Sequence, residues 1–266
     1  MAEPSKRWDF TKVEGLGNDF VVLGTPEREA WTLETRTAQA LCDRRRGIGA
    51  DGVLLLSAST RGDVRMEVIN CDGSRPEMCG NGLRCVVALL GEPGARVEVE
   101  TQAGLRVGEV RRDGAIRTDM GELVLTHPSI ELPEHGPGAG WSAGNPHLLV
   151  FPQSDPDEAA DKYGESWSRH PSFPEGVNVG FWREENELWR GVVHERGAGR
   201  TLACGTGAAA AAAEILRRRG ASEARLELRL PGGALQAEVS AEGDRARVFL
   251  SGPARIAFEG RWFQRV

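Results

Sequence analysis

The chain has 266 residues, which allows one large or two medium-sized domains. Hydrophobic residues make up 40% and charged residues 27%, a composition that excludes a wholly disordered protein. The net charge of −6 and the lack of a basic run argue against nucleic-acid binding. No apolar stretch is long enough for a membrane span. Residues 1–10 carry charges and no apolar core, so we expect no secretory signal.

The first half of the chain alternates predicted strands with two helices. A helix is predicted over residues 33–45, with Thr32 as its N-cap candidate. A second, very apolar helix is predicted over residues 81–90 and ends at Gly91. Short runs of alternating or continuous apolar residues predict the strands. These strands lie at residues 9–23 (one or two strands), 53–56, 64–69, 96–101, 105–111 and 115–120.

The second half shows the same coarse order after a Pro- and Gly-rich linker predicted at residues 128–140. A helix is predicted near residues 158–163, and a longer one over residues 207–219 contains six consecutive alanines. Its last three residues are arginines, which favour a helix C-terminus. Strands are predicted at residues 147–151, 177–182, 188–194, 225–230, 235–239 and 247–250, with a further C-terminal strand near 255–263.

Four sequence features recur in the same order at offsets of 125 to 129 residues. They include Gly17-Asn18 with Gly144-Asn145, and Cys79-Gly-Asn-Gly with Cys204-Gly-Thr-Gly. Such a pattern indicates two similar halves related by duplication. We therefore expect an N-terminal half at residues 1–122, joined by the C-terminal strand at 254–266, and a C-terminal half at residues 123–253.

The fold class follows from the two apolar helices. A helix that is apolar on all sides must be buried, and strands outnumber helices in both halves. We expect an α/β protein of the mixed α+β kind. It has two pseudo-symmetric domains, each a curled mixed β-sheet around a buried central helix, with the functional site in the cleft between the halves.

Cys79 and Cys204 each precede a Gly-x-Gly that opens a buried helix. The first turn of a helix offers free N–H groups that bind a carboxylate, and its positive end favours a cysteine thiolate. Two such thiols on opposite faces of a carbon can remove a proton and return one without a cofactor. Backbone N–H groups would stabilise the enediolate-like anion that forms. The sequence thus favours catalysed inversion of a carbon that bears hydrogen.

The other three cysteines receive structural interpretations. Cys42 and Cys85 lie on predicted helices and are assigned to packing, whereas Cys71 lies in a turn-like segment and stays unassigned. An odd number of cysteines argues against a disulfide framework and for a reducing cytoplasm. No Cys-x-x-Cys pair is present, so no metal is expected.

The ordered motifs resemble those of the diaminopimelate epimerase family, over nearly the whole chain. The motifs are Gly15-Leu-Gly-Asn-Asp-Phe20, Gly49-Ala-Asp-Gly52, Asn70-Cys-Asp-Gly-Ser74, Met78-Cys-Gly-Asn-Gly82, Gly144-Asn-Pro-His147, Val177-Asn-Val-Gly-Phe181, Glu195-Arg-Gly-Ala-Gly199 and Ala203-Cys-Gly-Thr-Gly207. The resemblance implies a cofactor-independent isomerase that interconverts LL- and meso-2,6-diaminopimelate in bacterial lysine and peptidoglycan precursor synthesis. The role of residues 49–52 stays open.

The resemblance also implies a role for each matching residue. Cys79 and Cys204 would be the catalytic acid and base, and His147 is a supporting candidate near them. The backbone N–H groups that would bind the reacting carboxylate belong to Gly80, Asn81, Gly205 and Thr206. Asn18 and Glu195 would hold the reacting ammonium group. The distal end of the substrate would be held by Asn70, Asn145, Asn178 and Arg196.

Two other functions stay open at this point. One is a related racemase for proline, hydroxyproline or another amino acid, and the other is a non-catalytic thiol or amino-acid-binding protein. Asn and Asp residues in Gly-rich segments are also common turn formers, which we expect to be the role of Asp51 and Asp72. The expected partner is a small-molecule substrate, with no nucleic acid and no membrane, and a homodimer is the assembly considered.

Overall fold

The computed structural model describes residues 6–133 and 135–264. Contacts within the chain divide it into two compact units, Met1–Ile116 with Pro253–Val266, and Arg117–Gly252. We call them the first and the second unit. Three predictions extend outside the described residues: the start of the N-terminal half (residues 1–5), linker position 134, and residues 265 and 266 after the C-terminal strand.

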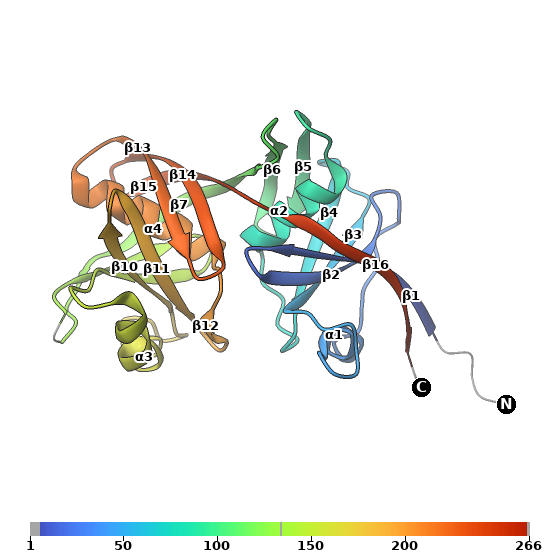
Figure 1. Cartoon of the computed structure of the whole chain (residues 1–266), viewed down its shortest axis with the longest axis horizontal. Helices are drawn as coiled ribbons and strands as arrows, with labels where there is room; N and C mark the ends of the chain where they lie inside the picture. Colours follow the sequence, from blue (N-terminus) through green and yellow to red (C-terminus); the bar gives the residue numbers. More distant parts are fainter. Residues whose placement is uncertain (1–5, 134, 265–266) are drawn as a thin grey trace. The chain divides into compact units, whose positions relative to one another are not determined.

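The first unit is an open, curled sheet with two helices (Figure 1). Its strand order is β16-β1-β2-β3-β4-β5-β6, in which β2 and β3, and likewise β4 and β5, are parallel. The bounds are β1 Lys6–Gly15, β2 Asn18–Gly24, β3 Gly52–Ser57, β4 Val64–Asn70, β5 Arg96–Thr101, β6 Gly104–Val110, β16 Arg255–Gln264, α1 Thr35–Cys42 and α2 Gly80–Leu90.

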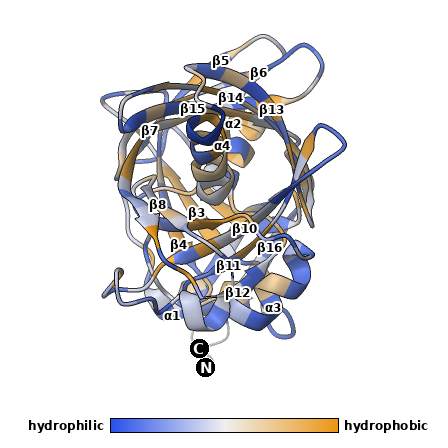
Figure 2. Cartoon of the chain, turned by 90° about the vertical axis from the view of Figure 1, so that its left-hand side faces the viewer, coloured by the Kyte–Doolittle hydropathy of each residue, from blue (hydrophilic) through white to orange (hydrophobic). Residues whose placement is uncertain are grey.

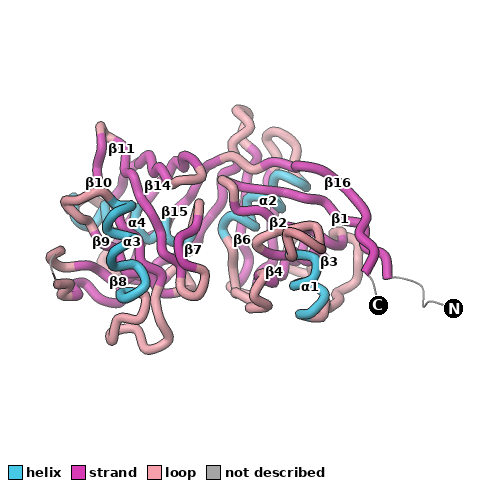
Figure 3. The backbone as a smooth tube through the Cα atoms, turned by 60° about the horizontal axis from the view of Figure 1, so that its bottom comes forward, coloured by secondary structure: helices cyan, strands magenta, loops and turns pink. Residues whose placement is uncertain are grey.

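Predicted residues 9–23 form two strands, β1 and β2, joined by a tight turn. Gly15 pairs with Asn18, and the two residues between them, Leu16 and Gly17, both have positive φ angles of 57° and 79°. This is the two-residue turn whose twist matches that of a β-hairpin, and glycine adopts it without strain. The turn places Asn18 at the start of β2. β16 lies antiparallel to β1 along its other side (Figure 3).

Helix α1 is shorter than predicted, and Thr32 is not its N-cap. The N-cap is Glu34, whose carbonyl oxygen accepts hydrogen bonds from the backbone of Thr37 and Ala38. The helix ends at Asp43 because its carboxylate accepts hydrogen bonds from two following backbone N–H groups, at 2.8 Å each. A short polar side chain that binds the following backbone in this way favours a turn over another helical residue.

The second unit closes into a ring of strands around α4. The strand order is β7-β8-β9-β10-β11-β13-β14-β15, and β15 pairs again with β7. Helix α4 contacts six of these strands and lies within them in Figure 2. The bounds are β7 Ile116–Ile130, β8 Gly138–Ser142, β9 Pro146–Val150, β10 Asn178–Glu185, β11 Leu188–Glu195, β12 Gly199–Thr201, β13 Glu223–Leu230, β14 Gly233–Glu242, β15 Arg245–Gly252, α3 Pro156–Trp167 and α4 Gly205–Arg219.

Both ends of the predicted linker at residues 128–140 are strand. β7 continues to Ile130 and β8 begins at Gly138. The sequence analysis predicted no strand in this region. The pairing of β7 with β8 shifts register twice, between Leu125 and His127 and between His127 and Ile130. Such irregularities let a strand accommodate Pro128, which cannot donate a ladder hydrogen bond.

The central helices confirm the predicted fold class. All six alanines of α4, residues 208–213, are fully buried, and the small side chains let the surrounding strands approach closely. In α2, Leu83, Val86 and Val87 are fully buried in the core of the first unit, whereas residues 88–90 at its end are only partly buried. The N-terminal turns of both helices are therefore held in place by packing against the surrounding strands.

Candidate active site

Cys79 is the N-cap residue of α2, as the sequence predicts. Its backbone is extended, and its Sγ atom accepts a hydrogen bond from the Gly82 N–H at 3.4 Å. Gly80, Asn81 and Gly82, which form the first turn of the helix, are buried. The Cys79 side chain itself is half-buried. The first unit thus holds a thiol beside the positive end of a buried helix.

A chain of amide and carboxylate hydrogen bonds leads away from this turn. The Asn81 Nδ2 donates to Asn18 Oδ1 at 3.0 Å, and Asn18 Nδ2 donates to Asp51 Oδ2 at 2.7 Å. The guanidinium of Arg44 bridges Asp51 and Asp19, at 2.9 and 2.7 Å. This network joins four segments of the chain and fixes the orientations of Asn81 and of Asn18, a predicted ligand.

Asp19 was missed by the sequence prediction, and Asp51, expected to be a turn former, instead accepts hydrogen bonds from the distant Asn18 and from Arg44. Burial pushes the pKa of Asp19 upward, but hydrogen bonds from Arg44 and from the buried Lys12 outweigh this and lower it. The Asp19 carboxylate therefore stays charged and fixes Arg44, which fixes Asp51. The proximity of Asp19 to Asp51 is not readable from the sequence, since they are 32 residues apart.

Asn70 ends β4 opposite Gly52 of β3. Its side chain donates to Ser74 Oγ at 2.9 Å, and its backbone is held by the same turn. Asp72 accepts hydrogen bonds from the N–H and the hydroxyl of Ser74, at 2.8 and 2.6 Å, which fits its predicted role as a turn former. Cys71 in this turn is exposed.

Cys204 is the N-cap residue of α4 in the second unit, in the same position as Cys79 in the first. It is buried, and its Sγ lies 3.5 Å from Thr206 Oγ1. Burial, followed by the negative charge of Glu195, raises the pKa of the Cys204 thiol well above its usual value. The prediction that this helix end gives a thiolate is wrong for Cys204, because burial and Glu195 outweigh the hydrogen bond from the Gly207 N–H.

Glu195 lies at the end of β11, and its negative charge and hydrogen bond contribute to the raised pKa of Cys204. Its carboxylate also accepts a hydrogen bond from the Thr201 hydroxyl at 2.7 Å. Gly205 and Thr206 form the buried first turn of α4. The second unit therefore brings together three of its predicted site residues, Cys204, Thr206 and Glu195.

A second group of predicted residues lies at one end of β9 and β10. Asn178 pairs with His147 across these parallel strands, and its Oδ1 accepts a hydrogen bond from the Arg196 backbone N–H at 2.9 Å. The His147 Nε2 lies 3.0 Å from Asn145 Oδ1. Burial lowers the pKa of His147 to about 3, so its imidazole is neutral at physiological pH. Its imidazole therefore orients the Asn145 amide.

Arg196 borders a cavity of about 750 Å³ in the second unit. Its Nη1 donates to the Glu175 carbonyl oxygen at 2.6 Å, and its side chain crosses Gly176 closely. Arg169, His170 and His194 also line this cavity, whereas Cys204 and Asn178 do not. Sequence analysis did not predict the cavity, because its wall combines the end of α3, the loop that follows it and the β11–β12 turn.

Cys42 and Cys85 are buried, as their predicted packing role requires. Burial raises the pKa of each thiol to about 12, so neither is a nucleophile at neutral pH. Among the described residues, no group of three or more His, Cys, Asp or Glu side chains could hold a metal ion. No helix in the described part of the chain is long and apolar enough to cross a membrane.

The fold is shared with amino-acid racemases, epimerases and related proteins. A hydroxyproline epimerase from Agrobacterium vitis superposes with a TM-score of 0.71 at 19% identity, covering 100% of this chain and 95% of that one. A PhzF-family phenazine biosynthesis protein of Bacillus anthracis gives a TM-score of 0.75 at 15% identity, covering 97% and 99%. At these identities the similarity defines the two-domain fold.

The family follows from closer sequence matches. The diaminopimelate epimerase family model matches this chain twice, at residues 10–126 and 141–257, in agreement with the internal repeat. A diaminopimelate epimerase of Desulforudis audaxviator is 41% identical over 280 residues, which cover 96% of this chain and 99% of the relative. The chain therefore belongs to the diaminopimelate epimerase family, and it is an isomerase.

Proposed function

We propose that this chain interconverts LL- and meso-2,6-diaminopimelate by two-base proton transfer between Cys79 and Cys204, within lysine and peptidoglycan precursor synthesis. One observation carries the assignment of the two thiols. Each unit has a cysteine as the N-cap of its central helix, directly before a buried, Gly-containing first turn. The choice of diaminopimelate as substrate rests on membership of the family.

The reaction needs no redox change. The thiolate of one cysteine takes the α-hydrogen as a proton, and the electron pair of the broken C–H bond enters the carboxylate to give an enediolate. The thiol of the other cysteine then donates its proton to the opposite face of the α-carbon. The two cysteines end with exchanged protonation states. The mechanism requires both thiols to reach the same α-carbon.

The helix N-termini stabilise the charge that develops on the substrate. The backbone N–H groups of Gly80, Asn81, Gly205 and Thr206 are proposed to bind the reacting carboxylate. The carboxylate gains negative charge as the proton leaves, so donors fixed in advance stabilise the transition state more than the ground state. Their burial in packed helices supports this, since no reorganisation is then needed.

The polar side chains are proposed to recognise the rest of the substrate. Asn18 and Glu195 would accept hydrogen bonds from the reacting ammonium group. The distal ammonium and carboxylate would be held by Asn70, Asn145, Asn178 and Arg196. Amides suit a substrate with both kinds of group, because each amide can donate and accept. The neutral His147 would support this set by orienting Asn145.

Exchange of the α-hydrogen in deuterated water tests the proposal. We expect deuterium to enter LL-diaminopimelate, with formation of the meso isomer, and not to enter proline or hydroxyproline. Exchange into proline or hydroxyproline instead would indicate the activity of the racemases that share this fold. Absence of exchange into any of these amino acids would favour a binding protein. Nuclear magnetic resonance of the α-position measures all three outcomes.

The enzyme is further proposed to act in the cytoplasm. All five cysteines are free in the structure, which suits a reducing compartment. Fractionation of cells that produce the chain, followed by detection in the cytoplasmic fraction, checks this. Recovery outside the cytoplasm would contradict it.

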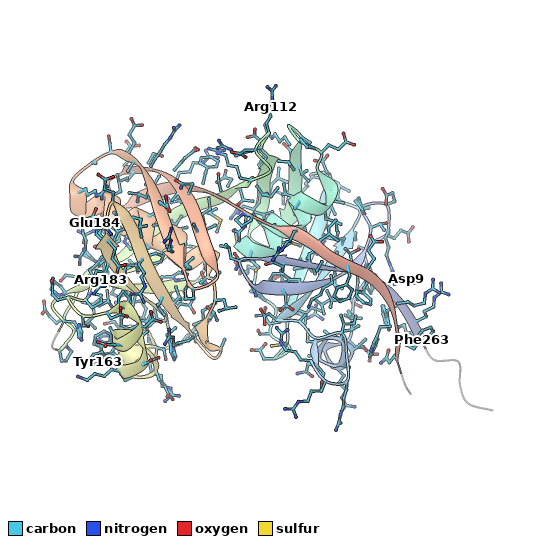
Figure 4. All side chains as sticks on the ribbon, viewed as in Figure 1. Asp9, Arg112, Tyr163, Arg183, Glu184 and Phe263 are labelled. Atoms are coloured by element: carbon cyan, nitrogen blue, oxygen red, sulfur yellow. The ribbon has the colours of Figure 1, made fainter. Side chains whose placement is uncertain are left out.

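A homodimer through β16 is the proposed assembly. β16 is the last strand of its sheet, and Ile256, Phe258 and Phe263 on it are 47 to 56% exposed. Figure 4 labels Phe263 near the end of this strand. We expect sedimentation velocity to show a dimer that Phe258→Asp dissociates. Leu202→Asp, an equally exposed apolar position in the second unit, is the control. A monomeric wild-type chain would refute the assembly.

A further inference from the structure

Arg84 is a fully buried arginine in the second turn of α2. Helical side chains point back toward the helix N-terminus, and this one does so. Its Nη2 donates to Asn81 Oδ1 at 2.7 Å, and its Nε donates to the Pro253 carbonyl oxygen at 3.3 Å. Its Nη1 is buried without a hydrogen-bond partner. Gly15 leaves the room for it, since a Cβ there would lie 3.2 Å from Nη2.

No described carboxylate forms an ion pair with this guanidinium. The charged or titratable groups that act on it are Cys79 and Cys85 of α2 and Glu14 of β1. Glu14 is already engaged, because it pairs with Arg255 of β16 and accepts the Gly17 N–H at 2.9 Å. The strands β5 and β6 also contact α2 but contribute no group that acts on Arg84.

A buried arginine without an acidic partner is costly for folding. Desolvation lowers the pKa of Arg84, yet a guanidinium stays protonated at neutral pH. Arginine is seldom fully buried unless it is paired. Its two hydrogen bonds go to uncharged oxygens, so no negative charge in direct contact neutralises the guanidinium. The nearby group that would gain most from it is an anion at the N-terminus of α2.

The equivalent position in the second unit lacks this charge. Arg84 is the fifth residue after Cys79, and the fifth residue after Cys204 is Ala209, which is also fully buried. Cys204 has the opposite electrostatic setting, since the negative charge of Glu195 acts on it. The two pseudo-equivalent thiols therefore lie at similar helix ends but in unlike fields.

We propose that Arg84 is a positioning residue that orients Asn81 and whose fixed positive charge favours the thiolate of Cys79. The resting enzyme then carries Cys79 as thiolate and Cys204 as neutral thiol. This inference rests on the proposed function, because it assigns Cys79 as the base and Cys204 as the acid for the first turnover. The opposite reaction direction requires the alternative protonation state, which is reached by turnover or by proton exchange with water.

Alkylation of each cysteine over about pH 5 to 10 tests the proposal, because only the thiolate reacts. Iodoacetamide is the probe, and mass spectrometry of the modified peptides gives separate rates for Cys79 and Cys204. The pH of half-maximal rate does not depend on how accessible a thiol is. We expect a lower half-maximal pH for Cys79 than for Cys204 in the wild-type enzyme.

Arg84→Met removes the charge and keeps an apolar side chain of similar length. A neighbouring opposite charge typically shifts such a group by one unit or more, so we expect the half-maximal pH of Cys79 to rise by about one unit. At neutral pH its alkylation should slow about tenfold, and kcat should fall similarly. Cys204 should be unaffected. Arg106→Met, in β6 of the same unit, is the matched control and should change neither thiol.

Arg84→Lys separates charge from geometry. It should keep the half-maximal pH of Cys79 near the wild-type value while kcat/KM falls, because lysine cannot reproduce the bonds to Asn81 and Pro253. An unchanged Cys79 profile in folded Arg84→Met would overturn the proposal. If that variant does not fold, a lower half-maximal pH for Cys204 than for Cys79 in the wild type overturns it. Full epimerase activity in Cys79→Ala would instead refute the proposed function.

Discussion

Epimerisation of diaminopimelate should fall by about 10²–10⁴-fold when either Cys79 or Cys204 is replaced by alanine, the range that positioned acid–base groups contribute. Each thiol is proposed to serve one face of the α-carbon, so the loss of either one leaves that face without a proton carrier. The two replacements should be about equally severe for complete inversion.

Both variants should lose inversion of the α-carbon while remaining folded. Both cysteines precede helices whose first turns are buried, and alanine fits the space that each thiol leaves, so both variants are expected to fold. Chiral separation of the product, with circular dichroism to confirm folding, measures the effect. Cys71→Ala is the control, since that thiol is exposed in a turn. Wild-type turnover in either catalytic variant would refute the two-base mechanism.

Binding of diaminopimelate should weaken by about ten- to a hundredfold in Arg196→Ala. A charge-assisted hydrogen bond to a buried carboxylate contributes about 1.5–3 kcal/mol, and each 1.4 kcal/mol is a factor of about ten in affinity. The backbone N–H of Arg196 would still donate to Asn178, so the replacement removes the side chain and leaves the main-chain contact. KM should therefore rise more than kcat falls.

Arg169→Ala provides a matched control for this variant. Arg169 borders the same cavity, but its side chain is 76% exposed and pairs with Glu165 four residues away. Surface pairs of this kind contribute little. Isothermal titration or steady-state kinetics with diaminopimelate measures both variants. Equal affinity in Arg196→Ala and the wild type would show that another group holds the distal carboxylate.

The local features of the site were predictable because they are written in short segments. A cysteine followed by Gly-x-Gly and an apolar run predicts a buried helix with a thiol at its N-terminus, and both α2 and α4 confirm it. Repetition of this pattern predicts two similar halves, and the family model matches each half once. These predictions need only helix periodicity, capping and chain-long comparison.

Long-range contacts were not predictable. The hydrogen bonds that hold Asn18 between Asn81 and Asp51 join residues 63 and 33 positions apart. The pairing of β15 with β7, which closes the second unit, joins elements at its two ends. Nothing in a local pattern selects one such partner over another, because many strands share the same alternation.

The fold class, the two thiols at helix N-termini and the family could all be predicted from short motifs and their order along the chain. The electrostatics at those thiols could not be predicted without the folded structure. Cys79 and Cys204 occupy equivalent positions, yet burial and Glu195 raise the pKa of Cys204, while an unpaired guanidinium lies in the helix of Cys79. The reason is that a helix end is a local feature, whereas desolvation and the field of distant charges depend on everything that packs around the group.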